Sequence, residues 1–152
     1  MDSSRKWMWL AVIIVVAIAL AAMQFLRANR PIRESSNAAT PLYTYGSITE
    51  GDIAIGAEQV LQYKLNFNKR THLHGTFLTG DKSRRISALV LTESDFEKWN
   101  TGTEFKAISS TGYVPWGKIE TVIEPGVYYL VIENRSKEYG GDKTVEIDFT
   151  AE

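Results

Sequence analysis

The run from Trp7 to Leu26 most constrains this chain, because its 20 residues carry no charge and Gln24 is its only strongly polar side chain. A helix of this length spans about 30 Å, which matches the hydrocarbon core of a bilayer. Lipid offers no partner to backbone N–H and C=O groups, and a helix satisfies them internally. We therefore expect residues 1–26 to be a membrane anchor, with residues 7–26 as a transmembrane helix whose partner is the lipid bilayer.

A cleaved secretory signal is the alternative interpretation of this segment. Arg5 and Lys6 precede the apolar run, and Ala19-Leu20-Ala21 has the small-x-small form of a cleavage site after Ala21. The run continues to Leu26, beyond the roughly 7–15 residues of a signal h-region, which favours a retained anchor. Basic residues flank both ends, and the short basic start favours an N-terminus inside the cell. These features predict a single-pass protein of the cell membrane with its remaining domain outside the cytoplasm.

Residues 27–41 separate the apolar run from the rest of the chain. They include Pro31 and Pro41, are mostly polar and show no hydrophobic period. This composition predicts a flexible linker. The organisation is then anchor, linker, and one domain over residues 42–152.

From Leu42 onward the hydrophobic period becomes two. Leu61, Tyr63, Leu65 and Phe67 alternate with polar residues, which is typical of a half-buried strand. Other strand-like segments occupy residues 73–77, 86–92, 118–123, 127–132 and 145–149. The turn sequence 124–126, Glu-Pro-Gly, predicts a hairpin between the strands on either side of it. Altogether the pattern predicts an all-β fold, an antiparallel, jelly-roll-like β-sandwich of about 8–9 strands.

One helix is expected between the strands. Ser94 and Glu97 have the capping-box spacing, with Ser94 as the N-cap. Phe96 and Trp99 would then share one helix face, and Gly102 would end the helix.

The run 124–134, Glu-Pro-Gly-Val-Tyr-Tyr-Leu-Val-Ile-Glu-Asn, resembles the penultimate strand of bacterial pre-peptidase C-terminal-like domains and of GOLD-like jelly rolls. The resemblance implies a non-catalytic accessory or binding sandwich and carries over no functional residue. It departs from the usual context, since such modules often follow a peptidase and these 152 residues contain none.

Composition excludes several functions. The chain has no cysteine, which removes disulfides, thiolate catalysis and cysteine-based zinc sites. From Leu42 onward 12 basic residues face 16 acidic ones, a poor balance for a nucleic-acid partner. The sequence shows no phosphate-binding glycine loop, nucleophile elbow or catalytic triad. We therefore expect neither an enzyme nor a cofactor.

His72 and His74 form the candidate metal site. Their i, i+2 spacing places both on one face of a strand, where Asp81 or Glu93 is a possible third ligand. The alternative is that both histidines are ordinary polar residues on the solvent face, opposite Leu73.

Tyr113 and Trp116 form the candidate binding site. Both lie in an aromatic loop that could stack on a sugar ring or anchor a protein, so the expected partner is a protein or a carbohydrate. The alternative is that Trp116 covers the open end of the sandwich as part of the core.

The polar loop Asn134–Gly141 allows two further interpretations. With Glu133 and Asp142 it could offer oxygens to calcium, although its spacing matches no calcium loop. Asn134-Arg135-Ser136 also fits a glycosylation sequon.

Three functions remain. The leading one is an extracytoplasmic binding or interaction module. The second is a structural subunit of a membrane complex that acts through its transmembrane helix. The third and weakest is a metal-dependent or hydrolytic enzyme centred on His72 and His74.

Overall fold

The computed structural model describes residues 42–152, so the expected anchor (1–26) and linker (27–41) lie outside the described residues. Within this range there are nine strands and one helix. In chain order they are β1 (Leu42–Tyr43), β2 (Gly46–Ile55), β3 (Val60–Phe67), β4 (Thr71–Leu78), β5 (Ser87–Thr92), α2 (Glu93–Thr101), β6 (Ser109–Ser110), β7 (Trp116–Ile123), β8 (Gly126–Glu133) and β9 (Lys143–Ala151). None of the described segments is a helix with the length and apolarity to cross a membrane.

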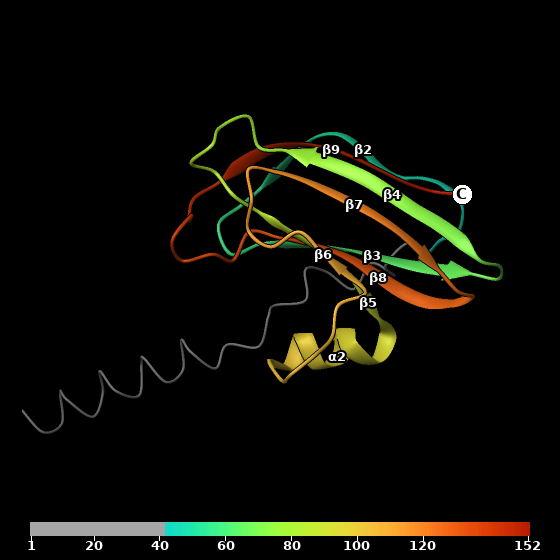
Figure 1. The fold of residues 1–152 in the computed structure, drawn as a ribbon. Coiled ribbons are helices and arrows are strands. Elements are labelled where there is room, and N and C mark those ends of the chain that lie inside the picture. The colour runs from blue at the N-terminus through green and yellow to red at the C-terminus, as the bar shows by residue number, and fades with distance from the viewer. Residues whose placement is uncertain (1–41) are drawn as a thin grey trace, which may run out of the picture. The chain divides into compact units, whose positions relative to one another are not determined.

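The strands form two sheets that lie face to face (Figure 1). The first sheet has the order β1-β3-β8-β5-β6 and the second the order β2-β9-β4-β7. Every pairing is antiparallel except that of β1 with β3. The all-β sandwich and the expected number of strands are confirmed.

The core lies between the two sheets and follows the predicted alternation. Leu65 and Phe67 of β3 are buried, as are Leu73 and Phe77 of β4, while the residues between them are more exposed. The same cluster includes Ile55, Ile86, Val90, Ile119, Leu130, Ile132, Ile147 and Phe149. Burial of this apolar surface is the main source of stability for such a sandwich.

Two glycines let aromatic rings pack against the second sheet from inside. Gly75 lies opposite Phe149, and a Cβ on Gly75 would come within 2.4 Å of the Asp148 carbonyl oxygen. Gly117 lies opposite Phe77, whose ring would be 2.5 Å from an added Cβ. A side chain at either glycine would therefore displace a core ring.

The predicted hairpin between β7 and β8 is wrong, because these strands belong to different sheets. β7 pairs with β4, whereas β8 lies between β3 and β5. In β8 the consecutive residues Leu130, Val131 and Ile132 are all buried, so this strand needs cover on both faces. The second sheet covers one face of β8 and the helix at Glu93–Thr101 covers the other, and the turn at Pro125 carries the chain from one sheet to the other.

Helix α2 begins at Glu93, and its N-cap lies two residues before the predicted one. Thr92, not Ser94, is the N-cap, and its Oγ1 accepts a hydrogen bond from the Asp95 backbone N–H (3.1 Å). Thr92 and Asp95 have the same capping-box spacing as Ser94 and Glu97. Thr92 ends β5 with the extended backbone (φ −68°, ψ 163°) that an N-cap requires, which decides between the two pairs. The expected end at Gly102 is confirmed, with φ 72° in the left-handed region.

Helix α2 covers the outer face of the first sheet (Figure 1). Trp99 packs there with Leu89, Leu91 and Val131 in a second buried cluster. Phe96 stacks on the predicted helix face with Trp99, at 5.5 Å between ring centroids, and on Tyr129 at 3.8 Å. The strands β2, β9, β4 and β7 have no described element over their outer face (Figure 1).

Candidate functional site

The outward side chains of the second sheet form a solvent-facing surface, named here the open face. Its members alternate with core residues along each strand, so they point away from the first sheet. They are Glu50, Asp52 and Ala54 on β2, Thr144, Glu146, Asp148 and Thr150 on β9, His72, His74, Thr76 and Leu78 on β4, and Trp116, Lys118, Glu120 and Val122 on β7.

Four of these side chains form a straight line across the sheet, named here the tryptophan row. Trp116 lies opposite Leu78, Leu78 opposite Glu146, and Glu146 opposite Asp52. Neighbouring strands are about 4.8 Å apart, so the row is roughly 14 Å long. Its apolar end is open to solvent, with Trp116 57% and Leu78 44% exposed.

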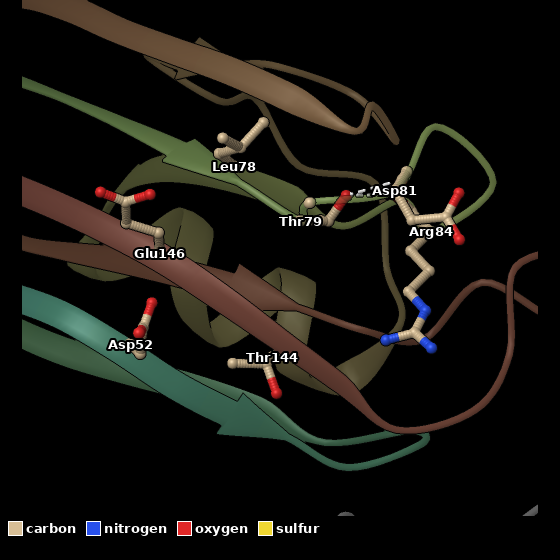
Figure 2. Close-up of a pocket in the computed structure, with 8 residues that line it drawn as sticks. Asp52, Leu78, Thr79, Asp81, Arg84, Thr144 and Glu146 are labelled. Carbon is tan, nitrogen blue, oxygen red and sulfur yellow. Dashed lines mark hydrogen bonds between the residues drawn. The ribbon is translucent and has the colours of Figure 1, made fainter.

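A pocket of about 450 Å³ lies along this row. Figure 2 shows Asp52, Leu78 and Glu146 on neighbouring strands, with Asp81 and Arg84 on the loop after β4. Thr79, Gly80 and Thr144 complete the lining. The pocket therefore combines three carboxylates, one guanidinium and two hydroxyls with one aliphatic side chain.

Two of the three pocket carboxylates, those of Asp52 and Glu146, remain available to a ligand. Among residues 42–152, neither Asp52 nor Glu146 forms an ion pair. The two negative side chains lie directly opposite each other. Opposed like charges destabilise a sheet, so this arrangement does not serve the fold. Asp81 accepts hydrogen bonds from the backbone N–H and hydroxyl of Ser83, which lower the pKa of its carboxyl group.

The structure places Tyr113 and Trp116 in different surroundings. The Tyr113 hydroxyl donates to Glu133 Oε1 (3.0 Å) on the first sheet. Burial, followed by the charge of Glu133, raises the pKa of Tyr113 to about 12. Trp116 projects from the open face of the second sheet, so the alternative that it covers the end of the core is wrong.

The two histidines point outward, with Leu73 buried between them, and each faces a glutamate. His74 Nε2 is 2.7 Å from Glu152 Oε1, and His72 Nε2 is 4.0 Å from Glu120 Oε1. The imidazole centroids are 5.0 Å apart. We name these four residues the histidine quartet; together with Lys118 they line a shallow pocket of about 290 Å³.

The expected third metal ligands do not join the histidines. Asp81 lines the pocket beyond the far end of β4, and Glu93 is paired with Lys64 at 3.1 Å. Within residues 42–152, no three His, Asp or Glu side chains have donor atoms already gathered around one point that could hold a metal ion. Metal binding by His72 and His74 stays a prediction.

The loop after β8 is organised around the side chain of Asn134, which is 1% exposed. Its Nδ2 donates toward the carbonyl oxygens of Ile55 (3.2 Å), Gly56 (3.0 Å) and Gly141 (2.9 Å). An amide held in this way offers no room for a glycan in the folded domain. The sequon interpretation of Asn134 is therefore wrong.

A lysine ammonium supplies the positive charge within this loop. Lys143 is buried, and its Nζ donates to Asn134 Oδ1 and to the Tyr139 carbonyl. Burial lowers the pKa of Lys143, and Arg84 lowers it further. Asp142 accepts from the Ala57 backbone N–H (2.9 Å), and Glu133 from Tyr113 and Arg135. The carboxylates of Asp142 and Glu133, which the calcium interpretation requires, thus accept hydrogen bonds from protein donors.

Sequence reasoning missed Leu78, Glu120 and Glu152 as neighbours of the candidate residues. Outward side chains recur at every second residue of β4 from His72 to Leu78, so the same alternation that placed the histidines also predicts an outward Leu78. Glu120 and Glu152 are identified only by the register of β7 and β9 on β4, which single-strand patterns do not contain.

The fold can now be compared with known proteins. The pre-peptidase C-terminal domain of a collagenase from Bacillus anthracis is similar over 77% of this chain and 100% of its own, with a TM-score of 0.50 and 16% identity. This likeness supports the resemblance seen in the sequence, and at this identity it concerns the fold alone.

Two weaker likenesses carry no argument about function. One is to a periplasmic inhibitor of g-type lysozyme from Aeromonas hydrophila, covering 75% of this chain and 100% of the inhibitor, with 11% identity and a TM-score of 0.47. The other is to a β-1,3-glucan-binding module from Bacillus halodurans, covering 73% of this chain and 98% of the module, with 13% identity and a TM-score of 0.41. No protein-family model matches the chain. No curated protein matches it.

Proposed function

We propose that this protein is a membrane-tethered, non-catalytic binding module that takes a short carbohydrate on the tryptophan row of its open face. The observation that carries the proposal is the 57% exposure of Trp116, beside Leu78 and at one end of a line of free carboxylates. A large aromatic residue is more often buried, as Trp99 is in this domain.

The chemistry of the row matches both the C–H groups and the hydroxyl groups of a sugar ring. The indole of Trp116 offers an apolar, polarisable face to ring C–H groups, and β7 fixes the backbone that carries it. Asp52 and Glu146 accept hydrogen bonds from hydroxyl groups, and the Arg84 guanidinium donates them. A few placed polar groups beside an apolar surface are the usual composition of a small-molecule site.

The proposed location follows from the N-terminal segment. Residues 7–26 would cross the cell membrane once, with the β-sandwich on the extracytoplasmic side. The 15 residues of the linker, 27–41, would allow a separation of up to roughly 50 Å from the bilayer if extended. A module tethered in this way could reach polymers or proteins at the cell surface.

The proposal is tested with the full chain in detergent micelles, by titration with oligomers of glucose, N-acetylglucosamine and mannose. We expect binding to at least one series, and a loss of at least about tenfold in affinity for Trp116→Ala, since an aromatic anchor typically contributes 1.4 kcal/mol or more. Val122→Ala is the matched control, because Val122 is 50% exposed on the same face of β7 but lies outside the row.

Absence of binding to all three series, or equal affinity of the Trp116→Ala variant, would remove the carbohydrate proposal. If Trp116→Ala instead disrupts a complex with a co-purifying protein, the row is a protein-binding site. Exchange of residues 7–26 for an unrelated transmembrane segment tests the structural-subunit alternative. Carbohydrate binding should survive that exchange, and its loss would indicate that the helix itself carries the function.

A further inference from the structure

The histidine quartet draws its side chains from β4, from β7 and from the residue after β9, at the far end of the open face from the tryptophan row. His74 lies directly opposite Glu120 of β7. His72 lies opposite Glu152, the residue that follows β9, with hydrogen bonds exchanged between their backbones at 2.6 and 3.0 Å. Directly opposite residues share one face of a sheet, so all four side chains point the same way.

The observed contacts run diagonally between these opposite pairs. Glu152 lies opposite His72 but contacts His74, at 2.7 Å. Glu120 lies opposite His74 but approaches His72, at 4.0 Å. Each carboxylate therefore lies opposite one imidazole and approaches the other, because diagonal neighbours remain within reach of long side chains.

We propose that the histidine quartet is a binding site for a divalent transition-metal ion, best matched by Zn²⁺, with His72, His74, Glu120 and Glu152 as ligands. Two imidazole nitrogens and two carboxylate oxygens are a ligand set that zinc accepts in tetrahedral geometry. The two carboxylates balance the charge of the ion. Calcium and magnesium prefer all-oxygen sites, so the imidazoles select against them.

Lys118 explains why the ligands are not yet gathered around one point. Its Nζ is paired with Glu120 Oε2, while Glu120 Oε1 stays 4.0 Å from His72 Nε2. The Glu120 side chain is 54% and the Lys118 side chain 51% exposed, so both can rotate without disturbing the core. An exposed ion pair of this kind contributes little to stability. Zinc therefore competes with the Lys118 ammonium for Glu120.

The test is calorimetric titration of zinc chloride into the chelator-treated full chain, prepared without a polyhistidine tag. We expect one ion per chain and no comparable binding of calcium. His72→Ala and His74→Ala should each weaken zinc binding by at least about tenfold, since loss of a ligand costs no less than loss of an outer-shell partner. Lys118→Gln should strengthen it, because the competing cation is gone while Glu120 remains.

The matched control is the double variant Asp52→Asn plus Glu146→Gln, which removes two carboxylates from the tryptophan row and leaves the quartet intact. Its zinc affinity should equal that of the unaltered chain. No zinc binding, or zinc binding that persists in a His72→Ala plus His74→Ala variant, overturns the proposal. So does binding that the control variant abolishes, since general attraction to acidic residues would then explain it. This proposal does not depend on carbohydrate binding, which is measured in the presence of chelator.

Discussion

The outer faces of the two sheets differ in exposure, although both belong to the same domain. That of the first sheet is covered by α2, and its side chains Leu89, Leu91 and Val131 are buried with Trp99. That of the second sheet is open, and its exposed side chains include Trp116. The tryptophan at the first face, Trp99, belongs to α2 and is buried, whereas Trp116 belongs to the second sheet and is accessible.

The outward residues of the strands account for this difference. In β5 the apolar run Ala88–Leu91 places apolar side chains on both faces, so this sheet needs a second layer of cover. In β9, by contrast, buried Val145, Ile147 and Phe149 alternate strictly with polar residues, so its outer face is stable in water. Strict alternation therefore marks the face that remains free for binding.

The largest effect that separates the two faces should come from the two tryptophans. Trp99→Ala should reduce the free energy of unfolding by about 3–5 kcal/mol, because it opens a cavity beneath the helix. Trp116→Ala should change it by no more than about 0.5 kcal/mol, because Trp116 is exposed. Urea denaturation of the full-chain variants, followed by circular dichroism, measures both values.

Comparable losses for the two variants would contradict the comparison. They would indicate that Trp116 packs against something in the folded chain and is unavailable to a ligand. A small loss for Trp99→Ala would instead mean that α2 is only loosely attached to the first sheet.

A smaller loss in the free energy of unfolding is expected at the N-terminus of α2, the helix that covers the first sheet. Thr92→Ala removes the N-cap hydroxyl, which accepts from the Asp95 backbone and donates to Asp95 Oδ2 (2.8 Å). The expected loss is about 1 kcal/mol. Ser94 is the N-cap that the sequence pattern predicts, and Ser94→Ala should reduce the free energy of unfolding by less than about 0.5 kcal/mol. A larger loss for Ser94→Ala than for Thr92→Ala would restore the original capping prediction.

Strands with an unbroken alternation were predictable from sequence, and β2 was not. β2 has Gly51 within it and a bulge between Ser47 and Thr49. The bulge changes which residues point inward, so Ile48 and Ile53 do not fall on one period of two. The two-residue strands β1 and β6 exist only through their pairing with longer neighbours, which no local pattern records.

The candidate sites show the same limit. The outward direction of His72 and His74 followed from their spacing on one strand. Their neighbours Glu120 and Glu152 depend on register between strands that are distant in the chain. The mistaken hairpin at Pro125 has a related cause, since turn residues specify a reversal of direction but not the sheet that the next strand joins.

A further effect, seen only at high pH, concerns the edge of the covered face, where Tyr113 and Arg135 both bind Glu133. Arg135 Nη2 is 3.2 Å from Glu133, and the Arg135 guanidinium lies over the Trp99 ring at 4.3 Å. Tyr113 donates to the same carboxylate, and burial raises its pKa to about 12, above the ordinary value of 10.0. Trp116, on the open face, is 57% exposed.

The raised pKa predicts the sign of a pH effect on stability. Below pH 10 Tyr113 is protonated in both the folded and the unfolded chain, so its stabilising contribution is fully present. Between pH 10 and about 12 the unfolded chain loses this proton while the folded chain retains it, so stability falls as pH rises. The free energy of unfolding should therefore fall more steeply over this range in the unaltered chain than in Tyr113→Phe. A difference titration of phenolate absorbance between the two should show one group with a pKa near 12; titration of that group near 10 instead would mean that Tyr113 is as accessible to water as the open face is.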